Sequence, residues 1–229
     1  RRPPRSTPFP STTLFRSSRQ LLVLGCGALA LELGHLFKSN SLVNVTLECL
    51  PASLHNRPDQ IPIRVRERLE VAVNDYDDIL VGYADCGTGG DLDVLCDEFN
   101  VVRLPGAHCY EFYLPVGVFE KLHDAEPATF YLTDYLVKHF DRLVFDGLGI
   151  TAHPELLAIY FGNYKRVVFL TQTGTADLQA DAARAAGKIG LPLEVTVTGY
   201  GQLETEIVEF GKRRPKSSSK ETQPTAASQ

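Results

Sequence analysis

Three cysteines lie in short connections where the sequence predicts that strands have just ended. Each of Cys26, Cys86 and Cys109 comes a few residues after a short apolar run. In a parallel sheet the carboxyl ends of the strands share one edge, so these side chains can converge there. Thiolate sulfur binds zinc and also holds iron–sulfur clusters. We therefore predict a metal ion or an iron–sulfur cluster bound by these three cysteines and His108, with Glu111 nearby.

Glycines surround these cysteines and favour a bound anionic group. Gly87, Thr88, Gly89 and Gly90 directly follow Cys86. Glycine lets backbone N–H groups approach a cluster or anionic ligand closely, and a helix N-terminus lowers the pKa of a neighbouring thiol. No two cysteines have the C-x-x-C spacing of a strong metal motif. Two other interpretations stay open: reactive thiols that act without metal, and unrelated buried cysteines.

A dinucleotide-type motif overlaps the first of these connections. The pattern Gly25-x-Gly27-x-x-Ala30 follows an apolar run, and Glu48 comes about 20 positions later. Glycines at this spacing form a tight turn close to a phosphate, and the acidic residue binds a ribose hydroxyl. A Rossmann-type enzyme that binds NAD or S-adenosylmethionine is therefore an alternative to the metal site.

Strand and helix patterns alternate along most of the chain. Short apolar runs predict strands at 21–25, 43–47, 78–84, 101–104, 166–170 and 193–198. Helical spacing predicts helices at 28–37, 63–73, 92–99, 116–123, 129–140, 155–161 and 175–188. Strands that alternate with helices indicate a three-layer α/β fold, with a mostly parallel, Rossmann-like sheet and helices on both faces.

Charge and composition limit the class of partner. The net charge is −5, and residues 1–17 and 212–229 each carry a net charge of +4, which leaves −13 on residues 18–211. An acidic surface repels the phosphate backbone, so we expect no nucleic acid partner. No apolar run approaches the roughly 20 residues that cross a bilayer, and the five cysteines show no disulfide spacing. We expect a cytoplasmic protein without a membrane partner.

The two ends of the chain differ in composition from the rest. Residues 7–17 match one reading frame of a widely used sequencing adapter at nine of eleven positions, which favours an assembly artefact over residues 1–17. A genuine disordered arm is the alternative. Residues 212–229 are basic and polar, as is typical of a disordered tail. We predict a single α/β domain over residues 18–211.

Several segments together resemble one prokaryotic family, domain of unknown function 1638. They are Cys26-Gly27-Ala28-Leu29-Ala30, Asp85-Cys86-Gly87-Thr88-Gly89-Gly90, Arg103-Leu104-Pro105-Gly106-Ala107-His108-Cys109-Tyr110-Glu111, and the segments 130–134, 153–156, 161–164 and 199–201. The resemblance spans roughly residues 21–210. It implies a setting beside corrinoid-dependent methyl transfer in anaerobic one-carbon metabolism, with a corrinoid protein or methyltransferase as partner. It assigns no catalytic residue.

The leading functional hypothesis is thus a protein that binds a cofactor, either a metal ion or an iron–sulfur cluster. Small molecules or cofactors are its expected partners. The first alternative is the enzyme that binds NAD or S-adenosylmethionine. The second is an interaction protein without catalysis.

Overall fold

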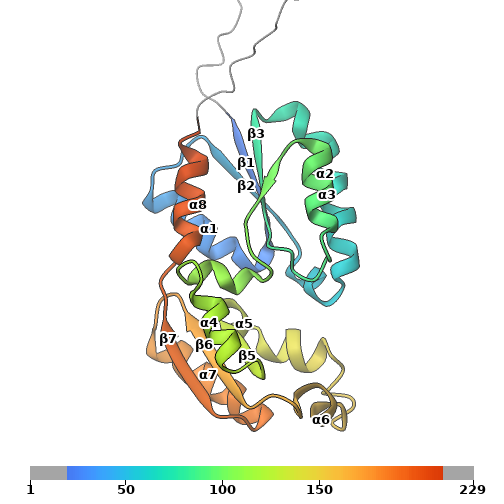
Figure 1. Cartoon of the computed structure of the whole chain (residues 1–229), viewed down its shortest axis with the longest axis vertical. Coiled ribbons are helices and arrows are strands. Elements are labelled where there is room, and N and C mark those ends of the chain that lie inside the picture. Colours follow the sequence, from blue (N-terminus) through green and yellow to red (C-terminus); the bar gives the residue numbers. More distant parts are fainter. Residues whose placement is uncertain (1–19, 214–229) are drawn as a thin grey trace, which may run out of the picture.

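The computed structural model describes residues 20–213, which form two parallel sheets with helices around them (Figure 1). The expectations for residues 1–17, and for the tail after residue 213, lie outside this range. We call the part built on the first sheet the first lobe and the part built on the second sheet the second lobe. The lobes lie one above the other along the long axis of the molecule (Figure 1).

The first lobe has a four-stranded sheet in the order β2-β1-β3-β4. All three pairings in this sheet are parallel. Helices α1 and α8 pack together on one face, and α2 and α3 pack together on the other (Figure 1). The elements are β1 (Leu21–Cys26), α1 (Ala30–Ser39), β2 (Val45–Leu50), α2 (Ile61–Asp75), β3 (Asp78–Gly82), α3 (Asp91–Phe99), β4 (Val102–Arg103) and α8 (Gly201–Gly211).

The second lobe has a three-stranded parallel sheet in the order β5-β6-β7. Its helices include a π-helical segment, η5, after α5. The elements are α4 (Val118–Ala125), β5 (Thr129–Thr133), α5 (Asp134–Lys138), η5 (Asp141–Asp146), α6 (Leu156–Phe161), β6 (Arg166–Thr171), α7 (Ala176–Ile189) and β7 (Leu193–Val197). After β7 the chain returns to the first lobe as α8 (Figure 1).

Burial explains why these strands form. Every residue of β1 is buried, which fits a central parallel strand covered on both faces. In the second lobe alternate residues face opposite sides: Phe169 packs in the core with α5 and α7, whereas Val168 and Leu170 pack toward α4. The predicted three-layer α/β class is thus confirmed, with the strands divided over two sheets.

The helix predicted at 129–140 is wrong in its first half, and the helix α8 was not predicted. Residues Thr129–Thr133 form β5, because aromatic and β-branched side chains suit a strand paired along its length with β6. The Thr133 hydroxyl then accepts a hydrogen bond from the Leu136 amide at 3.4 Å and starts α5. Among the described residues, no helix is long and apolar enough to cross a membrane.

Candidate metal centre

Three side chains in the first lobe bring metal-binding atoms together. The donor atoms of His55, Cys86 and Cys109 all lie within 4.8 Å of one another. They come from the connections that follow β2, β3 and β4 respectively. All five cysteines of the chain are free thiols, so both sulfurs are available as ligands.

The fold places this group where parallel sheets commonly bind ligands. β1 pairs with β2 on one side and with β3 on the other, so the direction of winding reverses at β1. Ligands bind in open α/β sheets beyond the carboxyl ends of the strands at such a reversal. The group lies in the connections that begin at these ends.

Hydrogen bonds beyond the last pairs of β3 and β4 position Cys86. The Asp85 amide donates to the Gly106 carbonyl at 3.1 Å, and the Cys86 amide donates to the Ala107 carbonyl at 2.9 Å. These bonds hold the connection after β3 against the one that leads to Cys109. Cys86 has a φ of +51°, a left-handed conformation that is uncommon for residues other than glycine and is often found at functional sites.

The predicted glycine-rich segment binds an anion of the chain itself. Asp85 accepts hydrogen bonds from the Thr88 hydroxyl at 2.9 Å and from the amides of Gly89 and Gly90 at 3.2 and 2.8 Å. Burial opposes ionisation, but these bonds and one from the Gly87 amide outweigh it and lower the pKa of Asp85. These donors therefore fix the loop that carries Cys86, with Asp85 in the place of an external anion.

A second set of contacts positions Cys109, the first residue of the short 3-10 helix η4 (Cys109–Tyr113). Arg103 donates to the carbonyls of Leu104 and Gly106 at 2.8 and 3.2 Å. The Glu111 carboxylate accepts from the His108 amide at 2.9 Å and so caps η4. Glu111 thus holds the turn through the backbone and does not belong to the donor group.

His55 lies on the 3-10 helix η2 (Ala52–Asn56) and has a thiol beside each ring nitrogen. Its Nε2 is 3.8 Å from the Cys109 sulfur, and its Nδ1 is 3.9 Å from the Cys26 sulfur. The two nitrogens of an imidazole point in different directions, so one ion binds only one of them. The structure therefore brings Cys86, Cys109 and His55 together, with Nε2 toward Cys109 and Nδ1 toward Cys26.

Hydrogen bonds set the protonation states in this group. The bond from Cys109, with the adjacent His55 ring, lowers the pKa of the Cys86 thiol to about 5, although burial opposes the shift. Bonds to Cys26 and Cys86 raise the pKa of His55 to about 10, although partial desolvation of the ring opposes the shift. The bond to Cys86 and burial raise the pKa of the Cys109 thiol well above its ordinary value. Without metal, Cys86 is therefore a thiolate beside an imidazolium at neutral pH.

Cys26 is buried in the core just behind this group. Its sulfur accepts a hydrogen bond from the Ala28 amide at 3.4 Å. The Tyr83 hydroxyl is buried beside the same sulfur, and burial, together with this contact, raises the pKa of that phenol above its ordinary value. Cys26 is thus a close neighbour of the donor atoms, with contacts that orient the His55 ring.

The histidine predicted from the sequence lies elsewhere. The His108 ring stacks on Tyr110 with ring centres 5.0 Å apart, and its edge meets Phe119. His108 is outside the group whose donor atoms lie within 4.8 Å. His55 was missed because the connection after β2 contains no cysteine or glycine, and Cys49 lies within the strand itself. Its position after the second strand was the available signal, since the rule about carboxyl ends applies to that connection as well.

The dinucleotide-type residues have structural contacts within the chain. A Cβ on Gly27 would lie 2.9 Å from the Leu50 carbonyl oxygen, and one on Gly25 would lie 2.9 Å from Leu33. Glu48 lies within β2 and accepts two hydrogen bonds from Arg68, at 2.5 and 2.7 Å. Packing accounts for both glycines and an ion pair accounts for Glu48, so these residues do not need a nucleotide to explain them.

An apolar cavity of about 240 Å³ adjoins the donor group and lies between the lobes. His55 and Cys109 are in its wall. The first lobe also contributes Ala28, and the second contributes Thr133 at the end of β5. Residues at or just beyond the carboxyl ends of strands in both sheets therefore line this cavity.

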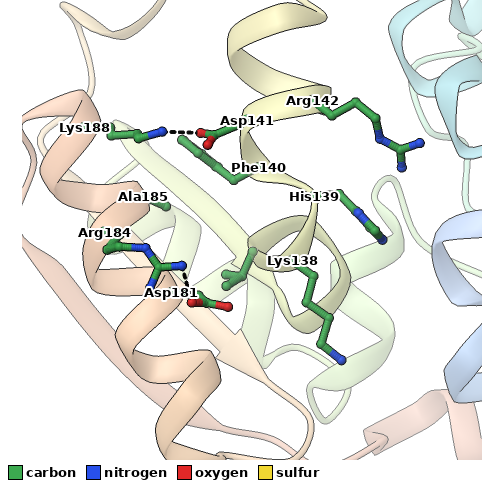
Figure 2. Close-up of a pocket in the computed structure, with 10 residues that line it drawn as sticks. Lys138, His139, Phe140, Asp141, Arg142, Asp181, Arg184, Ala185 and Lys188 are labelled. Carbon is green, nitrogen blue, oxygen red and sulfur yellow. Dashed lines mark hydrogen bonds and ion pairs between the residues drawn. The ribbon is translucent and has the colours of Figure 1, made fainter.

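Another cavity, of about 300 Å³, lies in the second lobe and is lined by charged side chains (Figure 2). Lys188 forms an ion pair with Asp141 at 2.5 Å, and Arg184 forms one with Asp181. Figure 2 shows His139 and Arg142 on the side of the helix turned away from Lys188. Pairing neutralises much of the charge here, and none of the three donor residues lines this cavity.

Comparison with known families confirms the family resemblance noted from the sequence. Residues 49–207 match the model of a family described as protein of unknown function (DUF1638). The match covers more than half of the chain, so the chain belongs to this family. No curated protein matches the chain in sequence.

Proposed function

We propose that the protein binds a single metal ion, with zinc the best-suited ion, through Nε2 of His55 and the sulfurs of Cys86 and Cys109. The observation that carries the proposal is the approach of these three donor atoms to within 4.8 Å of one another. Zn–S and Zn–N bond lengths in a tetrahedral site imply a sulfur–nitrogen separation of roughly 3.6 Å. The Cys109 sulfur and His55 Nε2 are 3.8 Å apart, close to that value.

A single ion fits this group better than the iron–sulfur cluster that the cysteines also suggested. Cluster ligands are usually cysteines bound to different iron atoms, and four are needed. Here one position belongs to an imidazole, and all donors are close enough to share one ion. Soft thiolate with imidazole is a donor set that zinc prefers.

Three protein ligands favour a centre of the catalytic type. Structural zinc sites have four protein ligands, whereas catalytic sites have three and keep the fourth position for water or substrate. An ion held in this way polarises an oxygen atom bound at the fourth position. Because His55 and Cys109 line the apolar cavity, we expect the fourth position to face it.

Cys26 supports this centre as an outer partner of His55. A histidine that binds metal through one nitrogen commonly uses the other in a hydrogen bond that fixes its tautomer and orientation. The Cys26 sulfur, 3.9 Å from Nδ1, is in that position. We propose that it orients the ring while Nε2 binds the ion.

A more specific proposal is that the protein takes part in corrinoid-dependent methyl transfer, as an accessory to a corrinoid protein or methyltransferase. The support for this version is the family resemblance. A zinc centre that accepts an exchangeable ligand is compatible with it. Co-purification with a corrinoid protein from cells grown without oxygen is its direct test.

Metal content tests the main proposal. The chain is purified without oxygen, and zinc and iron are measured by elemental analysis. We expect about one zinc per chain, and loss of most of it from Cys86→Ser, Cys109→Ser and His55→Ala. Cys26→Ser should keep the ion but bind it roughly 10- to 100-fold more weakly, as expected for an outer partner.

The matched control is Cys96→Ser, since Cys96 is buried in α3 outside the group. This variant should keep its zinc. Wild-type protein that contains no metal, or equal metal loss from Cys96→Ser and Cys86→Ser, would contradict the proposal. Metal-free protein in which Cys86 alone is alkylated would instead favour reactive thiols.

A further inference from the structure

We infer that the apolar cavity beside the proposed metal centre binds a small, uncharged organic molecule that carries an alcohol or carbonyl oxygen. The inference deepens the proposed function. The assignment of an oxygen-bearing group to the molecule rests on the proposed function. The size and polarity of the molecule follow from the cavity itself.

The volume of the cavity limits the size of the molecule. The cavity measures about 240 Å³. An engineered protein cavity of about 150 Å³ binds benzene, and pockets for drug-sized ligands begin at about 300 Å³. The expected molecule is therefore somewhat larger than benzene.

The walls of the cavity exclude a charged molecule. Leu136, Leu143 and Val144 line it from the second lobe, together with Phe130 and Tyr131 of β5. Among the described residues, no Asp, Glu, Lys or Arg side chain lines it. Transfer of an ion into apolar surroundings without a partner is strongly unfavourable. This cavity thus differs in chemistry from the charged cavity of Figure 2.

The charge of the metal centre indicates the group that would bind the ion. A zinc ion with two thiolates and a neutral imidazole has no net charge. An anionic ligand would add a negative charge to a cavity whose wall offers no Lys or Arg to balance it. An alcohol or carbonyl oxygen binds without adding charge, and the ion polarises it.

Two features indicate that the cavity is a built site. Leu143 and Val144 belong to the π-helix η5, and π-helical turns occur frequently at functional sites. The first lobe contributes Asn56, which follows His55 in η2 and carries an amide. A few polar groups in an otherwise apolar wall are typical of pockets that orient a small ligand.

Three probes of similar size test the inference: toluene, benzyl alcohol and benzoate. Binding of each to zinc-loaded wild type and to Cys86→Ser is measured by calorimetry. We expect toluene to bind both proteins equally, and benzoate not to bind the zinc-loaded wild type, in which His55 is a neutral ligand. Benzyl alcohol should bind the zinc-loaded wild type about tenfold more tightly than Cys86→Ser.

Cavity-filling variants provide the second measurement. Leu143→Trp should weaken toluene binding at least about tenfold, whereas Ile159→Trp, at a position 70% exposed on α6, should leave it unchanged. Circular dichroism checks that each variant is folded. Should Leu143→Trp not fold, Ala52→Leu fills the cavity from the first lobe and should have the same effect.

Failure of toluene to bind wild type, or equal binding to wild type and the filled variant, overturns the inference about the cavity. Tighter binding of benzoate than of benzyl alcohol to the zinc-loaded protein overturns the inference that the ligand is uncharged. Toluene binding by a wild type that takes up no zinc would uphold the cavity, overturn the assigned oxygen group and contradict the proposed function.

Discussion

The imidazole of His55 has a cysteine sulfur beside each of its nitrogens, and the two contacts have different consequences. The contact with Cys109 joins a ring nitrogen to the donor group, whereas the contact with Cys26 lies on the core side. Opposite charges on His55 and Cys86 stabilise each other in the metal-free protein. Metal binding releases the protons that His55 and Cys109 hold, so the affinity for the ion rises with pH.

The first prediction concerns the Cys86 thiolate. In the metal-free protein the hydrogen bond from Cys109 and the His55 ring lower the pKa of Cys86 to about 5. The ultraviolet absorbance of thiolate should therefore increase with a midpoint near pH 5. This step should be absent in Cys86→Ser and should move to higher pH in His55→Gln, which removes the cation.

Cys49 is the control within the same titration. Burial raises the pKa of the Cys49 thiol to about 11, so Cys49→Ser should leave the step near pH 5 unchanged. Absence of any thiolate below pH 7 in the wild type would show that Cys86 and His55 do not form a charged pair.

Two of the three residues that the structure brings together were named from the sequence as possible ligands. Cys86 and Cys109 were identified because a rule about sheet edges needs only the positions of the strands. The contribution of His55 depends on a short 3-10 helix that directs its ring toward the cysteines. No pattern of residues in the sequence predicts that helix. The glycine-rich segment was read as a site for an external anion, but Asp85, its immediate neighbour, accepts the hydrogen bonds.

At the scale of elements, close packing between β1 and β2 determines where His55 lies. Gly27 begins the short η1 helix (Gly27–Leu29) and approaches the backbone that leads from β2 into η2. A Cβ there would lie 2.9 Å from the Leu50 oxygen and 3.1 Å from the Ala52 nitrogen. Backbone atoms cannot move aside as a flexible side chain can. Gly27 thus keeps η2, and with it His55, against the end of β1.

The second prediction compares two glycines in this segment. Gly27→Ala should lower the free energy of unfolding by roughly 1–3 kcal/mol, because the added methyl group overlaps backbone. It should also weaken zinc binding by displacing η2. Gly34→Ala should raise the free energy of unfolding by about 0.5–1 kcal/mol, since Gly34 lies within α1 and has open space around it.

Urea unfolding of the metal-free proteins measures both changes. Similar effects of the two substitutions would contradict the packing role of Gly27. A loss of stability with Gly27→Ala in the absence of any nucleotide would support packing as the reason for this glycine.

Most helices and strands were predictable from hydrophobic spacing, and the exceptions have physical causes. Continuous apolar strands such as β1 and β6 are buried on both faces and stand out in the sequence. The strand β5 runs directly into α5, so its aromatic residues were read as the first turns of a helix. The division into two sheets depends on which strands pair, and local patterns do not contain that information.

At the scale of the whole molecule, a buried carboxyl group lies where the lobes meet. Glu32 on α1 is only 6% exposed, and its Oε2 has no hydrogen-bond partner among the described residues. Burial raises its pKa above the ordinary value, and the charge of Asp134 in the second lobe adds to this shift. The protonation state of Glu32 therefore depends on the packing of the second lobe against α1.

The third prediction is a change of stability with pH. A raised pKa in the folded protein gives a stabilising contribution that is complete below the ordinary pKa of 4.5 and is lost as the pH rises through the folded value. Glu32→Gln removes this loss of stability, because an amide does not ionise. The gain in the free energy of unfolding of the variant over wild type should therefore be larger at pH 7 than at pH 4, by roughly 1–2 kcal/mol.

Unfolding of wild type and variant at the two pH values measures the difference. Glu204→Gln, at an exposed position on α8, is the control and should change stability by less than about 0.5 kcal/mol at either pH. A larger benefit of Glu32→Gln at pH 4 than at pH 7 would contradict a raised pKa for Glu32.

The single-domain boundaries at residues 18–211 stay a prediction.

The proposed metal ion lies between the connections of the first lobe. X-ray absorption at the metal edge of protein purified without oxygen tests this proposal most directly, because it counts the sulfur and nitrogen neighbours of the metal. We predict one zinc site with two sulfur ligands, one imidazole nitrogen and one further light atom, unchanged in Cys96→Ser. Three or more sulfur ligands, iron–iron scattering from a cluster, or the absence of bound metal would contradict the proposed centre.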